Sequence, residues 1–117
     1  MVRVYWPILD VIKLLGPRFV EEFNHKRINQ KITLKTIWPR TQTPPQKKFP
    51  FLQAGIESKR EVRLAPEGVD FSLGYTIYGN TVRFISSSKE SFGFLITSRE
   101  FAQTMITNFD IIWDSLK

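Results

Sequence analysis

The strongest structural constraint in this sequence is a two-residue turn between two segments in which apolar side chains alternate. Gly79-Asn80 separates 71–78 from 81–87, and both residue types tolerate the positive φ that a two-residue hairpin turn requires. Because strand side chains alternate between faces, this turn also sets which residues share a face. The predicted opposite pairs are Tyr78–Thr81, Ile77–Val82, Tyr75–Phe84 and Leu73–Ser86. The last three pairs make one face apolar, and a mixed face holds Tyr78, Thr76, Arg83 and Ile85.

Hydrophobic periodicity predicts further elements on both sides of the hairpin. The other expected strands are 2–6, 32–38, 61–64 and 92–96. The expected helices are 8–15, 17–30 and a C-terminal helix behind the capping box of 97–100. The unbroken apolar run 92–96 is typical of a strand covered on both faces. The long 40–58 segment is expected to be a loop.

Two of these helices have an apolar stripe that we expect to face a core. On the 17–30 helix the expected inward residues are Phe19, Val20, Phe23 and Ile28. On the C-terminal helix they are Phe101, Met105, Phe109, Ile112, Trp113 and Leu116. The predicted order is therefore β-α-α-β-β-β-β-β-α, an α/β (α+β) fold in which helices flank one mixed β-sheet. A chain of 117 residues suits a single domain over 1–117.

The residue inventory excludes several classes of site. The chain has no cysteine and a single histidine, His25, so disulfides, thiolate chemistry and two-histidine metal sites are all excluded. No phosphate-binding loop or nucleophile elbow motif occurs. We therefore expect a protein that is not an enzyme, with no catalytic residue, metal or cofactor. No apolar run approaches the ~20 residues that span a bilayer, and no signal peptide is present, so a cytoplasmic location is expected.

The chain carries a net charge of +6, which permits contact with nucleic acid or another anion. A basic, soluble surface is the simpler interpretation. On the 61–64 strand, Glu61 and Arg63 share a face that is opposite to that of Val62. A half-buried Arg63 needs a partner such as Glu61 or another carboxylate, whereas a functional Arg63 would clamp an acidic ligand or a phosphate. The candidate ligand-binding residues are Arg27, Arg40, Glu61 and Arg63.

Several segments resemble, in the same order, the C-terminal half of TrmB-type transcriptional regulators. They are EVRLAP at 61–66, IYGNTV at 77–82, GFLI at 93–96, SREFA at 98–102 and the Phe109…Trp113 pair. Arg27 on a helix before the 32–37 strand and Pro39 extends the similarity over most of the chain. Such regulators join a winged helix-turn-helix to a phospholipase D-like effector domain. The resemblance implies a phospholipase D-like half domain without the catalytic HxK pair, in agreement with the lone His25.

The resemblance further implies an effector-sensing domain that forms a homodimer and reaches DNA through a winged helix upstream of Met1. The sugar-binding region of such regulators has no counterpart here. The twofold interface is expected to use an exposed apolar strip of the last helix or of Phe49–Leu52. Two alternatives are a stand-alone module that binds nucleic acid through the basic loop 40–63, and a minimal phosphodiesterase. No contact with a membrane is expected.

Overall fold

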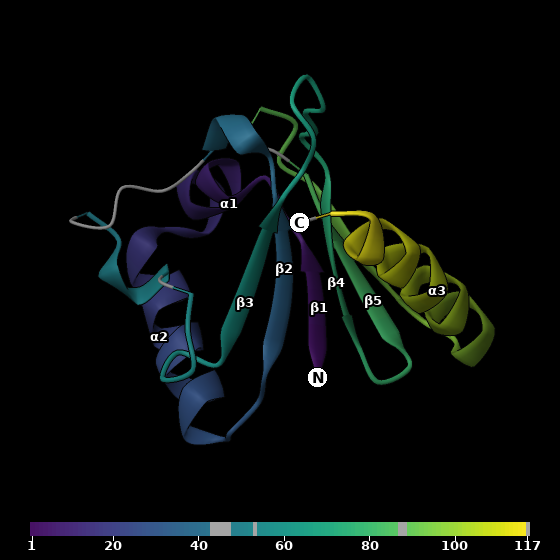
Figure 1. Ribbon diagram of the computed structural model, residues 1–117, viewed down its shortest axis with the longest axis horizontal. Coiled ribbons are helices and arrows are strands. Elements are labelled where there is room, and N and C mark those ends of the chain that lie inside the picture. Colours follow the sequence, from purple (N-terminus) through teal and green to yellow (C-terminus); the bar gives the residue numbers. More distant parts are fainter. Residues whose placement is uncertain (43–47, 53, 87–88, 117) are drawn as a thin grey trace.

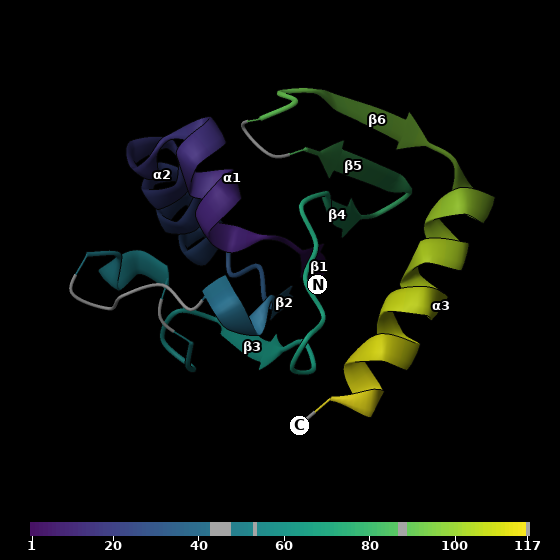
Figure 2. The same ribbon diagram turned by 90° about the horizontal axis from the view of Figure 1, so that it is seen from above.

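The computed structural model describes residues 1–42, 48–52, 54–86 and 89–116, which form a six-stranded mixed sheet with helices on both faces (Figures 1 and 2). The strands are β1 (Val2–Tyr5), β2 (Leu34–Trp38), β3 (Arg60–Leu64), β4 (Gly74–Tyr78), β5 (Thr81–Ile85) and β6 (Gly93–Thr97). The helices are α1 (Ile8–Leu15), α2 (Pro17–Asn29) and α3 (Arg99–Ser115), with 3-10 turns η1 (Arg40–Gln42) and η2 (Pro50–Leu52). The predicted order of elements and the α+β class are confirmed.

The strands lie in the order β3-β2-β1-β4-β5-β6. β1, β2 and β3 are parallel neighbours, whereas β4 runs antiparallel to β1 and continues into the antiparallel β5 and β6. Parallel neighbours need a crossover connection, which α1 and α2 supply between β1 and β2. Both helices therefore lie on one face of the sheet, and α3 covers the other (Figure 2).

The hairpin register is the predicted one: Tyr78 pairs with Thr81, Ile77 with Val82 and Tyr75 with Phe84. Gly79 takes the positive φ of the turn, at +56°. The fourth predicted pair is wrong, because β4 begins at Gly74 and leaves Leu73 exposed. Ser86 instead pairs with Phe92, donating its backbone N–H to the Phe92 carbonyl at 3.0 Å.

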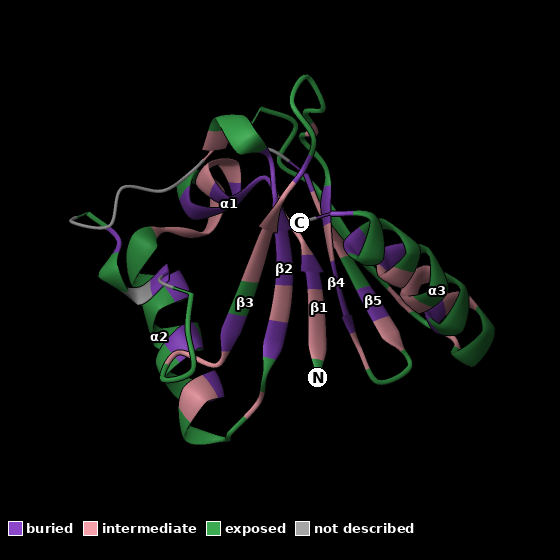
Figure 3. Ribbon diagram, viewed as in Figure 1, coloured by how far each residue is buried: buried purple, intermediate pink, exposed green. Residues whose placement is uncertain are grey.

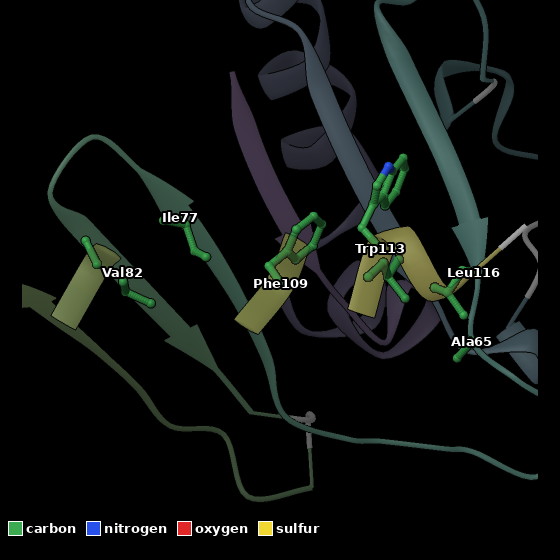
Figure 4. Close-up of a cluster of buried hydrophobic side chains, with 8 residues drawn as sticks. Ala65, Ile77, Val82, Phe109, Trp113 and Leu116 are labelled. Carbon is green, nitrogen blue, oxygen red and sulfur yellow. The ribbon is translucent and has the colours of Figure 1, made fainter. Parts of the chain in front are cut away.

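The larger core lies between the sheet and α3 (Figure 4). Its buried members are Ile37, Ala65, Ile77, Val82, Ala102, Phe109, Trp113 and Leu116. The helix begins after Ser98, whose hydroxyl accepts a hydrogen bond from the Phe101 backbone N–H at 3.2 Å; the capping residue is thus one position later than predicted. Most of the predicted inward residues of this helix contact the core, but Ile112 is exposed.

A second core lies on the opposite face, beneath α1 and α2. It buries Ile8, Ile12, Val20, Trp38, Phe49 and Leu52. The buried Phe49 and Leu52 cannot supply the exposed strip that was expected at 49–52. Figure 3 shows that the buried parts of all the helices face the sheet.

The expected inward face of α2 is confirmed for Val20, which is buried, but it is wrong for Phe19 and Phe23. Phe19 and Phe23 are 54% and 41% exposed, and the buried residues of this helix are Val20, Asn24 and Arg27. Positions 20, 24 and 27 follow one narrow stripe along a helix, so packing this stripe on the sheet turns both phenylalanines away from it. The polar Asn24 and Arg27, and not Phe19 and Phe23, therefore pack between α2 and the sheet.

The expected burial of 92–96 on both faces is also wrong. β6 is the last strand of the sheet, and Phe92, Phe94 and Leu95 are exposed. The same run of apolar residues can form a central strand or an edge strand, and the strand order of the folded sheet decides which of the two it is. The sheet therefore ends in an apolar edge.

We expect Phe109→Ala to lower the free energy of unfolding by about 3–5 kcal/mol, because Phe109 is fully buried between α3 and the sheet. Ile111→Ala on the exposed side of the same helix is the matched control and should change stability by no more than about 0.5 kcal/mol. Urea denaturation followed by circular dichroism measures both. Equal effects of the two substitutions would contradict this packing of α3.

Candidate ligand-binding groove

Arg63 lies on the α3 face of β3 and binds the end of that helix. Its Nη1 donates to the backbone carbonyls of Trp113 at 2.6 Å and Leu116 at 3.1 Å, and its guanidinium lies 4.4 Å above the Trp113 ring. Carbonyls at a helix C-terminus carry partial negative charge and lack helical partners. The partner of Arg63 is thus the end of α3 and not the carboxylate that we predicted.

The other predicted residues lie elsewhere. Glu61 is exposed on β3 beside Lys35 of β2, Arg40 is exposed at the start of η1, and Arg27 is buried under α2 on the opposite face from Arg63. The structure therefore does not bring the four residues together into one site.

Arg27 is 3% exposed and holds α2 against the starts of two strands. Its Nη1 donates to the carbonyls of Ile32 at 2.9 Å and Lys59 at 3.1 Å, and its Nη2 to the Ser58 carbonyl at 2.8 Å. Nη2 also donates to Asn24 Oδ1 at 3.2 Å. Burial lowers the pKa of Arg27. A charge held by carbonyl dipoles alone is still costly to bury.

A second buried arginine, Arg60, lies beside the first. It is 6% exposed, and its Nη2 donates to the same Asn24 oxygen. Its Nε and Nη1 have no hydrogen-bond partner in the described part of the chain. Among the described residues, no ion pair neutralises either guanidinium. Burial, and then the charge of Arg27, lower the pKa of Arg60 to about 9.

The groove that adjoins this cluster lies between α2 and strands β1, β4 and β5, and its volume is about 490 Å³. We call it the α2 groove. Its aromatic lining consists of Trp6, Phe19, Phe23 and Tyr78. Its cationic lining consists of Lys26, Arg27 and Arg83, and the described residues that line it include no aspartate or glutamate. The exposure of Phe19 and Phe23 is explained by their place on the wall of this groove.

Arg83 is held at the groove by a neighbouring tyrosine. Its Nη2 donates to the Tyr78 hydroxyl at 3.1 Å, and its guanidinium lies 5.7 Å from the ring centre of the same residue. The indole Nε1 of Trp6 and the Nε of Arg27 are buried and have no hydrogen-bond partner among the described residues. The groove therefore combines an apolar wall with positive charge, which suits an anionic ligand with an apolar body.

Sequence reasoning located the hairpin side of the α2 groove. The hairpin register correctly placed Thr76, Tyr78, Arg83 and Ile85 on one mixed face, and all four line the groove. It missed Trp6, and it missed Arg60 and Asn24 behind the groove. The available signal for Asn24 was its spacing, because it lies four residues after the buried Val20 on the same side of the helix. The apolar Phe19 and Phe23 nearby pointed to a different inward face.

The remaining chemistry in the structure is limited. His25 is exposed on α2, with its Nε2 3.8 Å from Glu21 Oε1. The residues that the structure describes contain no group of three histidine, aspartate or glutamate side chains placed to hold a metal ion. No described helix is long and apolar enough to cross a membrane.

Comparison with known proteins finds similarity at the level of structure. No protein-family model matches the chain, and no curated protein matches it in sequence. The chain superposes on TrmBL2, described as an archaeal chromatin protein with a novel mode of DNA binding, with a TM-score of 0.70 and 15% identity. The match covers 99% of this chain and 44% of TrmBL2. The two chains share this fold, and the present chain spans less than half the length of that protein.

We expect Arg60→Met to leave the chain at least as stable as the parent at pH 7, because the substitution removes a buried charge with unsatisfied donors. The pKa of Arg60 in the folded chain lies below its value in the unfolded chain. Above about pH 9 the unfolded state therefore binds more protons than the folded state, and the free energy of unfolding rises with pH. The parent should therefore gain stability relative to Arg60→Met between pH 8 and pH 10.5. Urea denaturation of both proteins across this range measures the difference. A parent that instead loses stability relative to the variant would contradict the buried, unneutralised state of Arg60.

Proposed function

We propose that this chain is a non-catalytic effector-sensing and dimerisation domain of a TrmB-like transcriptional regulator. The observation that carries the proposal is the structural match to TrmBL2, which extends over 99% of this chain. Because the match covers 44% of that longer protein, a domain with this fold operates there beside other chain segments. In this proposal a winged helix upstream of the domain reads the DNA.

The α2 groove supports the sensing part of the proposal. Sensing requires a concave site in which a small molecule changes the packing of a movable element. One wall of the α2 groove is a helix and the other is a sheet. A ligand between them contacts both, so its binding energy acts directly on the position of α2.

The apolar edge of the sheet supports the dimerisation part. β6 is the outermost strand of the described sheet, and an exposed apolar edge is a template for pairing with another strand. Phe94 and Leu95 point to opposite faces of β6 and are both exposed. We propose that two copies pair through their β6 edges about a twofold axis, so that the β6 edge of each sheet is covered by the other copy.

We expect the parent chain to be a dimer in sedimentation equilibrium. Leu95→Lys should convert it to a monomer, because each partner would bring a charge into the shared edge. Val69→Lys, at an exposed apolar residue in the segment before β4, is the matched control and should remain dimeric. A parent that is monomeric at every concentration would overturn the dimerisation part of the proposal.

A second candidate function is direct binding of nucleic acid through the basic loop 40–63. The net charge of +6 favours it, and Arg40 and Lys48 are exposed in that segment. However, Arg60 is buried and Arg63 binds the end of α3, so this loop presents fewer cations than its sequence suggests. Lys47 lies outside the described residues.

Fluorescence anisotropy with a short DNA duplex separates the two functions. Loop binding requires the affinity to fall steeply between about 50 and 200 mM salt, because neutralised phosphates release counterions. Arg40→Gln with Lys48→Gln should then weaken binding, and Lys13→Gln with Arg18→Gln, at exposed positions on α1 and α2, should weaken it less. Our first proposal expects no such salt-dependent binding by this chain alone.

A further inference from the structure

We propose that the α2 groove is the effector site and that its ligand is a small amphipathic anion with one carboxylate-type group on an apolar body. This inference rests on the proposed sensing function and specifies its ligand. The ligand is expected to lie along α2 with its charged group at one end of the groove and its apolar body at the other.

The direction in which the α2 groove runs follows from the strand register. Tyr78 ends β4 beside the start of β1, whereas Ile85 ends β5 opposite Gly74, at the end of the sheet where β1 leads into Trp6. In Figure 1 the helix α2 runs down the sheet, from the level at which β1 ends toward the level at which β1 starts. The α2 groove therefore has one end at the start of β1 and the other at its end.

Charged residues occupy only part of the groove along this direction. The end at the start of β1 carries Lys26, Arg27, Gln30 and Tyr78, together with the apolar Val2 and Ile32. The opposite end carries Trp6, Leu15, Phe19 and Ile85. Arg83 lies between them, opposite Thr76 in the middle of β4. The groove therefore has its cations at one end and in its middle and none at its other end, and an amphipathic anion has the matching polarity.

The cations of the groove lack the carboxylates that normally pair with such charges in the described part of the chain. Within the described residues, Lys26 and Arg27 form no ion pair, and Arg83 is held by the neutral Tyr78 hydroxyl. Lys26 and Arg83 are exposed, so their donors are accessible from the groove. A carboxylate oxygen accepts hydrogen bonds from such donors and neutralises their charge at the same time.

The size of the groove favours a small molecule as the occupant. About 490 Å³ lies within the roughly 300–1,000 Å³ typical of small-molecule pockets. A neutral apolar ligand would leave the cations unneutralised, and a cationic ligand would be repelled by them. Charge complementarity therefore selects an anion.

Isothermal titration calorimetry with three probes of equal chain length tests the inference: decanoate, 1-decanol and decyltrimethylammonium. We expect decanoate to bind at least about tenfold more tightly than decanol, since hydrogen bonds between charged groups are stronger than those to a neutral hydroxyl. The cationic probe should bind more weakly than decanol. Repeating the comparison with 4-phenylbutyrate and 4-phenylbutanol extends it to an aromatic body.

Substitutions of the cations and of the apolar wall should have different effects. Lys26→Gln with Arg83→Gln should weaken decanoate binding about tenfold or more and leave decanol binding unchanged. Phe19→Ala should weaken both probes. The matched controls are Arg18→Gln, an exposed cation of α2 outside the groove, and Ile111→Ala, at an exposed apolar residue of α3; neither should change the affinity of either probe.

Three results would overturn the inference: no binding of either carboxylate, equal affinity for acid and alcohol, or decanoate binding that survives the double substitution. Sedimentation of the same samples keeps the proposed function separate. A dimer that binds no carboxylate removes this ligand class and leaves the dimerisation domain in place. A monomer that binds decanoate with the expected selectivity removes the dimer and leaves the site.

Discussion

The buried guanidinium of Arg27 is the contact on which the rest of this face of the molecule depends. It donates to carbonyls at the start of β2 and just before β3, and to Asn24 on its own helix. These bonds orient α2 so that Val20, Asn24 and Arg27 face the sheet. Because a helix presents only one narrow stripe to a surface, Phe19 and Phe23 must then lie on its side, where they form a wall of the α2 groove.

The arginines on the two faces of the sheet have different partners. Arg63 neutralises the end of α3 at the edge of the larger core, where its guanidinium also stacks on Trp113. Arg27 and Arg60 lie under α2 with one shared asparagine and no carboxylate among the described residues. Two adjacent buried cations oppose folding, so an anion that reaches them would stabilise the folded domain. In our proposal, a ligand in the α2 groove acts on the position of α2.

Local patterns in the sequence were sufficient for elements whose partners are close along the chain. The Gly79-Asn80 turn determined three cross-strand pairs, and with them the face that Arg83 and Tyr78 share. The limits of α1 were also correct. Failures came where the environment is set by distant segments: the inward face of α2, the partner of Arg63 and the exposure of β6. Each depends on which element lies above a residue, and residue spacing does not contain that information.

By itself, the sequence determined the order of the elements, the α+β class, the hairpin register and the absence of cysteine chemistry, because turn geometry and side-chain alternation act over a few residues. Only the tertiary structure decided that Arg27 and Arg60 meet under α2, that Arg63 binds α3 and that β6 is an edge. These contacts join residues more than 30 positions apart in the chain. Their geometry exists only once the sheet has assembled, since the strand order places the segments side by side.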